Sequence, residues 1–163
     1  MTRAMFALSA IMIATICFHS RATAQISSVQ PLGFGIEGTW DLDVTFVDCT
    51  TGMALAPSSR SLVSYVTGGT YVEEPSSVAP SRRYPGLGVW RHVRARNYAL
   101  AFKSFQFNAD GTSNGKIVVT ANTTHNQDDT LTSYAVARFF NAAGDMTATR
   151  CVSVSGTRFT GEQ

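Results

Sequence analysis

Runs of β-branched and aromatic residues separated by short turns constrain the fold of this chain more than any other feature. The longest pair lies within residues 86–124, where the aromatic run 98–107 and the β-branched run 115–120 flank the turn sequence Asn-Ala-Asp-Gly at 108–111. Asn, Asp and Gly tolerate left-handed backbone angles, so such a cluster between two runs of this kind predicts a β-hairpin.

The clearest single strand lies near the start of the folded region. Apolar and polar residues alternate there, and one face carries Trp40, Leu42, Val44 and Phe46. An alternation with a period of two is typical of a strand with one face in an apolar environment. Asp41 and Asp43 lie on the opposite face, where we expect them to be solvated rather than to act as a paired acid and base.

Eight such runs account for most of the chain, and no amphipathic helical segment of usable length lies between them. We expect strands at residues 39–47, 61–66, 70–74, 87–94, 98–107, 115–124, 130–140 and 146–154. Short connections make consecutive strands antiparallel neighbours, and a meander of eight strands leaves two exposed edges unless it closes. The sequence therefore predicts an all-β fold, a single antiparallel eight-stranded up-and-down barrel.

The first residues are typical of an export signal. Arg3 precedes an apolar run over residues 4–18, and Ala22-Thr-Ala24 is a small-x-small cleavage site. The run is too short for an ordinary membrane-spanning helix, and no second apolar segment follows it. We expect a signal peptide at 1–24, a flexible leader at 25–37, a barrel domain at 38–163, and a secreted or periplasmic product without a membrane span.

Removal of the signal changes the charge of the chain. Arg3 and Arg21 leave with it, so 11 basic residues remain against 11 acidic ones. The one local concentration of positive charge begins at Arg82 and Arg83 and continues through Arg91, His92, Arg94 and Arg96. An anion-binding patch would need such a cluster, but alternating arginines are typical of the solvated face of a strand. We expect no nucleic-acid partner.

The cysteines support barrel closure. Cys17 lies in the signal, which leaves Cys49 at the end of the first expected strand and Cys151 inside the eighth. A reactive or metal-binding pair would have a Cys-x-x-Cys spacing or a nearby histidine cluster, and the sequence has neither. In an oxidising compartment we therefore expect a Cys49–Cys151 disulfide, which would place the first and last strands side by side.

Signals for catalysis or metal binding are weak. The sequence contains no Gly-x-Ser-x-Gly elbow, and only His92 and His125 remain after the signal. His125 with Asp128 and Asp129 could ligate a metal, but Asn, Asp and His are frequent in hairpin turns for backbone reasons. We assign no catalytic residues, no metal and no cofactor.

Gly38-Thr-Trp40, at the head of the first strand of an exported meander, resembles the calycin superfamily of lipocalins and avidins. That resemblance implies an eight-stranded barrel that binds a small hydrophobic molecule inside. It also implies that Trp40 packs at the closed end of the barrel beneath a basic residue, for which Arg158 stands at the matching place. The chain is similar as well to uncharacterised secreted bacterial proteins of this size, which imply no function.

These observations lead to a binding hypothesis with open alternatives. The expected ligand contacts are Trp40, Trp90, Tyr98, Phe102 and Arg158. The preferred function is binding of a small hydrophobic molecule without transforming it. The alternatives are a structural or interaction module without a ligand, a barrel-type enzyme similar to the plant cyclase and dirigent barrels, and an outer-membrane barrel. The sequence does not assign an oligomeric state.

The first testable prediction concerns processing. We expect cleavage after Ala24, so that the exported protein starts at Gln25. Intact mass spectrometry of exported material checks this start directly. A product that retains Cys17, or that carries a lipid on it, would contradict the prediction.

Overall fold

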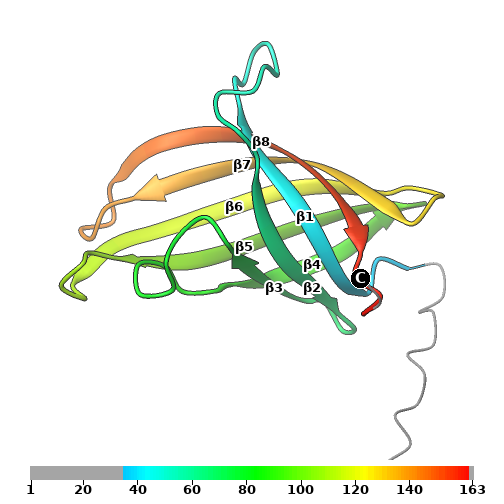
Figure 1. Cartoon of the computed structure of the whole chain (residues 1–163), viewed down its shortest axis with the longest axis horizontal. Helices are drawn as coiled ribbons and strands as arrows, with labels where there is room; N and C mark the ends of the chain where they lie inside the picture. Colours follow the sequence, from blue (N-terminus) through cyan, green and yellow to red (C-terminus); the bar gives the residue numbers. More distant parts are fainter. Residues whose placement is uncertain (1–34, 162–163) are drawn as a thin grey trace, which may run out of the picture.

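The computed structural model describes residues 35–161, which form one closed antiparallel barrel without a helix (Figure 1). The strands are β1 (Gly38–Val47), β2 (Ser59–Val66), β3 (Thr70–Pro75), β4 (Gly86–Arg94), β5 (Asn97–Phe107), β6 (Ser113–His125), β7 (Thr130–Phe140) and β8 (Met146–Arg158). Each strand pairs with the next, and β8 pairs with β1. The predicted up-and-down barrel is confirmed. The expected signal peptide and most of the expected leader lie outside the described residues.

The eighth strand is longer than the sequence predicts, because it continues through Gly156 to Arg158. Glycine weakens an isolated strand, yet this one lies where two chain segments approach closely. A Cβ atom at Gly156 would lie 2.3 Å from Leu42 Cδ2 and 2.6 Å from the Asp41 carbonyl oxygen. Gly156, which interrupts the strand pattern in the sequence, therefore allows β8 to pair closely with β1.

Three hairpins use the same five-residue turn. In each, an Asn backbone N–H donates to the carbonyl four residues later, as from Asn108 to Thr112 at 2.9 Å. The fourth residue takes a positive φ, which is 82° at Gly111 and 96° at Gly144. The turn between β6 and β7 carries Asp129 at this position instead of glycine, with φ 58°. A non-glycine residue there suggests that its side chain has a role of its own.

The inner face of β1 carries three of the four apolar residues assigned to it. Trp40 and Leu42 are buried and Val44 packs against the core, but Phe46 is 39% exposed. The expectation that Phe46 lies inside is wrong, because pairing between β1 and β2 ends at Val44 and Ser59. Beyond that pair, β1 has no β2 neighbour, so the Phe46 side chain is not covered by β2.

The outer face of β1 carries an exposed ion-pair cluster, as expected. Arg60 on β2 donates to the carboxylates of Asp41 and Asp43, the latter at 3.4 Å. Hydrogen bonding and attraction from Asp41, with a further contribution from Asp43, raise the pKa of Arg60. These carboxylates neutralise a neighbouring cation at the surface and lie away from the barrel interior.

The disulfide lies at the seam between the first and last strands. Cys49 follows β1, Cys151 lies in β8 beside Val47, and their Cα atoms are 5.2 Å apart. That separation is within the usual range for a disulfide. Figure 1 shows the end of β8 beside the beginning of β1, so the covalent bond and the strand pairing join the same two segments.

A second prediction concerns this cross-link. We expect the double variant Cys49→Ala and Cys151→Ala to have a free energy of unfolding about 3–5 kcal/mol lower than that of the oxidised protein. The reason is that the bond closes a loop of about 100 residues. Urea denaturation of the two proteins measures the difference. Thr45→Ala, on the outer face of β1 opposite Ser153, is the control and should cost little. Free thiols in the exported protein would contradict the prediction.

Candidate binding site in the barrel interior

The barrel interior contains a cavity of about 100 Å³, partly open to solvent, between β1–β3 and β5–β8. Most of its wall is apolar and comes from inward positions of the strands: Leu42, Val44, Val63, Leu100, Phe102, Val119, Ala121, Leu131, Ala135, Val152 and Val154. Two alanines, Ala121 and Ala135, face each other across β6 and β7. Small side chains at opposed positions leave space where larger ones would fill the barrel.

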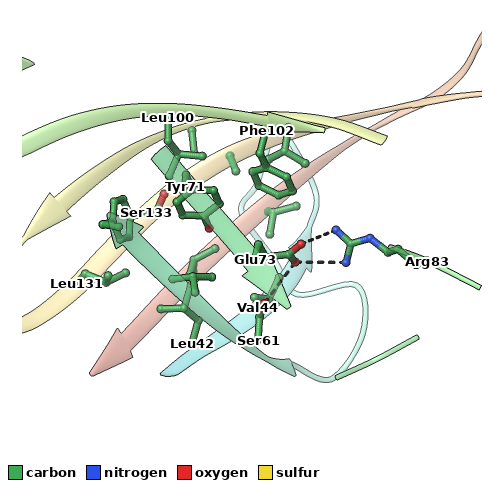
Figure 2. Close-up of a pocket in the computed structure, with 17 residues that line it drawn as sticks. Leu42, Val44, Ser61, Tyr71, Glu73, Arg83, Leu100, Phe102, Leu131 and Ser133 are labelled. Atoms are coloured by element: carbon green, nitrogen blue, oxygen red, sulfur yellow. Dashed lines mark hydrogen bonds and ion pairs between the residues drawn. The ribbon is translucent and has the colours of Figure 1, made fainter. Parts of the chain in front are cut away.

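One part of the cavity wall is charged. Figure 2 shows Arg83 reaching toward the Glu73 carboxylate from a separate segment of the chain. Arg83 Nη2 donates to Glu73 Oε2 at 2.7 Å, and Nη1 donates to Oε1 at 3.3 Å. The Ser61 hydroxyl donates to the same carboxylate at 3.3 Å. The two charged side chains are only 8% and 11% exposed, so the pair is a buried one.

The local sequence explains why Glu73 faces inward. Along β3 the buried residues are Tyr71 and Glu73, two positions apart, which is the spacing of one strand face. Glu73 pairs across the sheet with Gly86. A Cβ atom at Gly86 would lie 2.8 Å from Glu73 Oε2 and 2.7 Å from Phe102 Cδ2. The missing side chain therefore gives the carboxylate its room inside the barrel.

Arg83 is held in place by the segment between β3 and β4. This segment pairs with the end of β5, where the Tyr84 N–H donates to the Phe105 carbonyl at 3.0 Å. The Phe107 N–H donates in turn to the Arg82 carbonyl at 2.9 Å, and Arg83 forms an isolated bridge with Gln106. Backbone bonds on both sides of Arg83 thus fix the direction from which its side chain enters.

The sequence-based expectation for this arginine is wrong. Arg82, Arg91 and Arg94 are exposed, as expected for a solvated face, but Arg83 is buried. Its neighbour Arg82 gives no indication of this burial, because Arg82 lies in an exposed turn whereas Arg83 forms a bridge with Gln106. Arg83 and Glu73 are the functional candidates that the sequence did not reveal. The two-residue spacing of Tyr71 and Glu73 is the one signal that could have suggested Glu73.

Tyr65, Tyr71 and Ser133 complete the polar part of the wall. Burial raises the pKa of Tyr65 to about 12, and a long hydrogen bond with Thr123 lowers this pKa only slightly. Burial also raises the pKa of Tyr71 well above its ordinary value, and the negative charges of Tyr65 and Glu73 would add to this effect. Both phenols are therefore neutral groups at neutral pH, so the Glu73–Arg83 pair supplies the charge in the described cavity wall.

The residues expected to contact a ligand lie in different places. Phe102 lines the cavity, whereas Trp40, Trp90, Tyr98 and Arg158 are not among the residues of its wall. Trp90 donates from Nε1 to the Val66 carbonyl at 2.9 Å and packs edge-on against Tyr65 and Tyr98. Trp90 on β4 and Tyr98 on β5 thus pack against each other beside the cavity.

Trp40 and Arg158 form one closed end of the barrel, as the calycin resemblance implies. The Arg158 guanidinium lies 4.3 Å from the Trp40 ring centre, within range of a cation–π interaction. It donates to the Glu37 carbonyl at 2.6 Å and to the Gly35 carbonyl at 3.0 Å. Trp40 Nε1 donates to the carbonyl of Ile36, which is fully buried. Residues 35–37 therefore lie across this end.

His125 and Asp129 belong to the same closed end. His125 is only 2% exposed, packs edge-on against Trp40, and bonds Asp129 through Nε2 at 2.8 Å. Asp129 also accepts from Arg158 Nε at 2.7 Å. The expectation of an ordinary turn histidine is wrong, because the imidazole fills the barrel end. Asp128 has the expected turn role and accepts from Thr130, which lowers its pKa.

Neither a metal-binding cluster nor a membrane-spanning helix is found in residues 35–161. No three His, Cys, Asp or Glu side chains in this part of the chain lie close enough to hold a metal ion. None of its segments is a helix that is long and apolar enough to cross a membrane. No protein-family model matches the chain, and no curated protein matches it significantly. The interior geometry therefore carries the functional argument.

A third prediction follows from Asp129, whose pKa is lowered by its hydrogen bonds with Arg158 and His125. A lowered pKa stabilises the fold above the ordinary carboxyl pKa, and this contribution disappears as the pH falls below about 4. We expect Asp129→Asn to cost about 1 kcal/mol at neutral pH, a modest value because the carboxylate is half exposed, and less at low pH. Urea denaturation at several pH values measures this.

The control for this prediction is Asp43→Asn. Asp43 also contacts an arginine, but at 3.4 Å on the exposed outer wall, so its replacement should change stability little at any pH. Asn accepts the positive φ at position 129, which separates the charge from the backbone conformation. A cost for Asp129→Asn that is equal at neutral and acidic pH would contradict the assigned role of the carboxylate.

Proposed function

We propose that this protein is an exported carrier that binds a compact, mostly apolar molecule inside the barrel and does not transform it. The observation that carries the proposal is the interior cavity, whose wall is mostly aliphatic with one polar region. Small-molecule sites in proteins have this composition, in which apolar surface provides affinity and a few polar groups fix orientation.

The cavity size limits the ligand. Sites for drug-sized ligands occupy about 300–1,000 Å³, whereas an engineered apolar cavity of about 150 Å³ accepts benzene. A cavity of about 100 Å³ is suited to a ligand of about five or six non-hydrogen atoms. The proposed ligand is therefore a short-chain or single-ring compound, smaller than the cargo usually associated with a lipocalin-like barrel.

The barrel-type enzyme is the weaker alternative. Such an enzyme needs a polar group inside, and Glu73 is one. However, both oxygens of its carboxylate already accept hydrogen bonds from Arg83, and Ser61 donates a further one. A carboxylate engaged in this way is poorly placed to move a proton to or from a substrate. Binding without chemistry accounts for the same residues more simply.

A fourth prediction tests binding. We expect benzene or n-butanol to perturb the NMR signals of the Leu42, Val119 and Leu131 methyl groups and to raise the melting temperature of the protein starting at Gln25. A ligand at 100 times its Kd stabilises the folded state by about 2.7 kcal/mol. Ala121→Leu should abolish the response by filling the cavity, whereas Ala101→Leu, on the outer face of β5 opposite Thr120, should leave it intact.

One outcome would favour a different function. If none of these probes perturbs the cavity methyl groups, an interaction module becomes the better description of the barrel. The outer wall supports that alternative, because Tyr84, Leu87, Val89 and Phe105 expose apolar surface on and beside β4 and β5. Contiguous exposed apolar surface marks sites of interaction more often than scattered apolar residues do.

A further inference from the structure

We propose that the interior selects an uncharged ligand that carries a hydroxyl group, such as a small alcohol, and that the Glu73–Arg83 pair enforces this selection. The inference rests on the proposed binding function and specifies its ligand class. The pair would act in two ways, by excluding ions from the cavity and by bonding the hydroxyl group.

Exclusion of ions follows from charge balance. Glu73 and Arg83 contribute one negative and one positive charge to the cavity wall, and their 2.7 Å contact brings these charges together. A ligand carboxylate or ammonium group would add a charge with no partner. An unpaired charge in a buried site costs several kcal/mol, whereas a neutral ligand incurs no such cost.

The pair cannot easily open to accept an ion. Arg83 is held between two backbone hydrogen bonds to β5, at Arg82 and at Tyr84. Glu73 is held by its place in β3 and by the hydroxyl of Ser61. Separating the two side chains would leave each charge buried without its partner, and an unpaired buried charge strongly destabilises the fold.

Recognition of a hydroxyl follows from the hydrogen-bonding capacity that remains. A carboxylate offers about four acceptor positions, and Glu73 uses two of them with Arg83, while the one Ser61 hydroxyl proton is shared between Glu73 at 3.3 Å and the Glu74 carbonyl at 3.2 Å. Arg83 Nε is buried without an acceptor among the described residues, but it lies on the side of the guanidinium away from Glu73 (Figure 2). The remaining capacity at the pair is therefore on the carboxylate, and a ligand hydroxyl can donate its proton there, which a hydrocarbon of the same size cannot do.

The test compares n-butanol, butyrate and n-butylammonium, which are alike in size and differ in charge. Methyl NMR titration of the protein starting at Gln25 should show n-butanol binding at least tenfold more tightly than either ion at neutral pH. Butyrate should approach n-butanol in affinity when the solution is acidified below the pKa of the free acid, because the ligand then becomes neutral. Equal binding of all three at neutral pH would overturn the inference.

Two variants test the pair itself. Glu73→Gln leaves the Arg83 charge without a partner, so butyrate should gain at least tenfold in affinity. Arg83→Met leaves the Glu73 carboxylate without a partner, so n-butylammonium should gain in the same way. The affinity for n-butanol should fall modestly in each. If the variants fold and neither ion gains affinity, the pair is structural and the inference fails.

Matched controls separate this effect from net charge. Asp41→Asn and Arg60→Met change the charge of the protein by the same amounts on the outer wall, and they should leave the selectivity unchanged. If one variant at Glu73 or Arg83 fails to fold, the other still tests the pair, and the titrations of the unmodified protein test the preference for a neutral ligand. Binding of n-butanol together with both ions would refute the ligand class alone, whereas no binding of any probe would refute the proposed function too.

Discussion

The pairing of β1 with β8 is the constraint on which the rest of this structure depends. Seven hairpin connections bring consecutive strands together at little entropic cost, but the contact between the first and last strands joins residues more than 100 positions apart. Three features stabilise that seam. Gly156 allows close approach to Leu42, the Cys49–Cys151 bond connects the two strands covalently, and Arg158 at the end of β8 covers Trp40 near the start of β1.

Closure also determines what the interior can be. Once the sheet has no free edge, every inward side chain must find its partners inside the barrel. At the closed end Trp40 contacts both His125 and Arg158, and Asp129 at the surface balances the arginine, whereas His125 Nδ1 has no partner among the described residues. Elsewhere in the interior the requirement is met by Glu73 and Arg83, which satisfy each other's charge. The cavity lies among the apolar residues between these polar groups.

The two arginine–carboxylate pairs differ in what they contribute. Asp129 is half exposed, so its bond to Arg158 chiefly orders a turn and the end of the barrel. Glu73 is buried beside a cavity, and replacing a buried charge pair by a matched apolar pair often leaves stability unchanged or raises it. We propose the selection of a neutral ligand as the role of this pair.

The sequence by itself determined the eight strands and their order, because alternation of side chains and turn residues are local properties. It also predicted the cysteine pair, whereas the contact between Trp40 and Arg158 was implied only by the resemblance of Gly38-Thr-Trp40 to calycins. Only the tertiary structure decided that Glu73 and Arg83 meet, that His125 fills the barrel end, and that Trp90 and Tyr98 pack beside the cavity rather than in its wall. The physical reason is that local pattern fixes which residues share a strand face, whereas cross-strand register and the path of the segment after β3 fix which faces meet across the barrel.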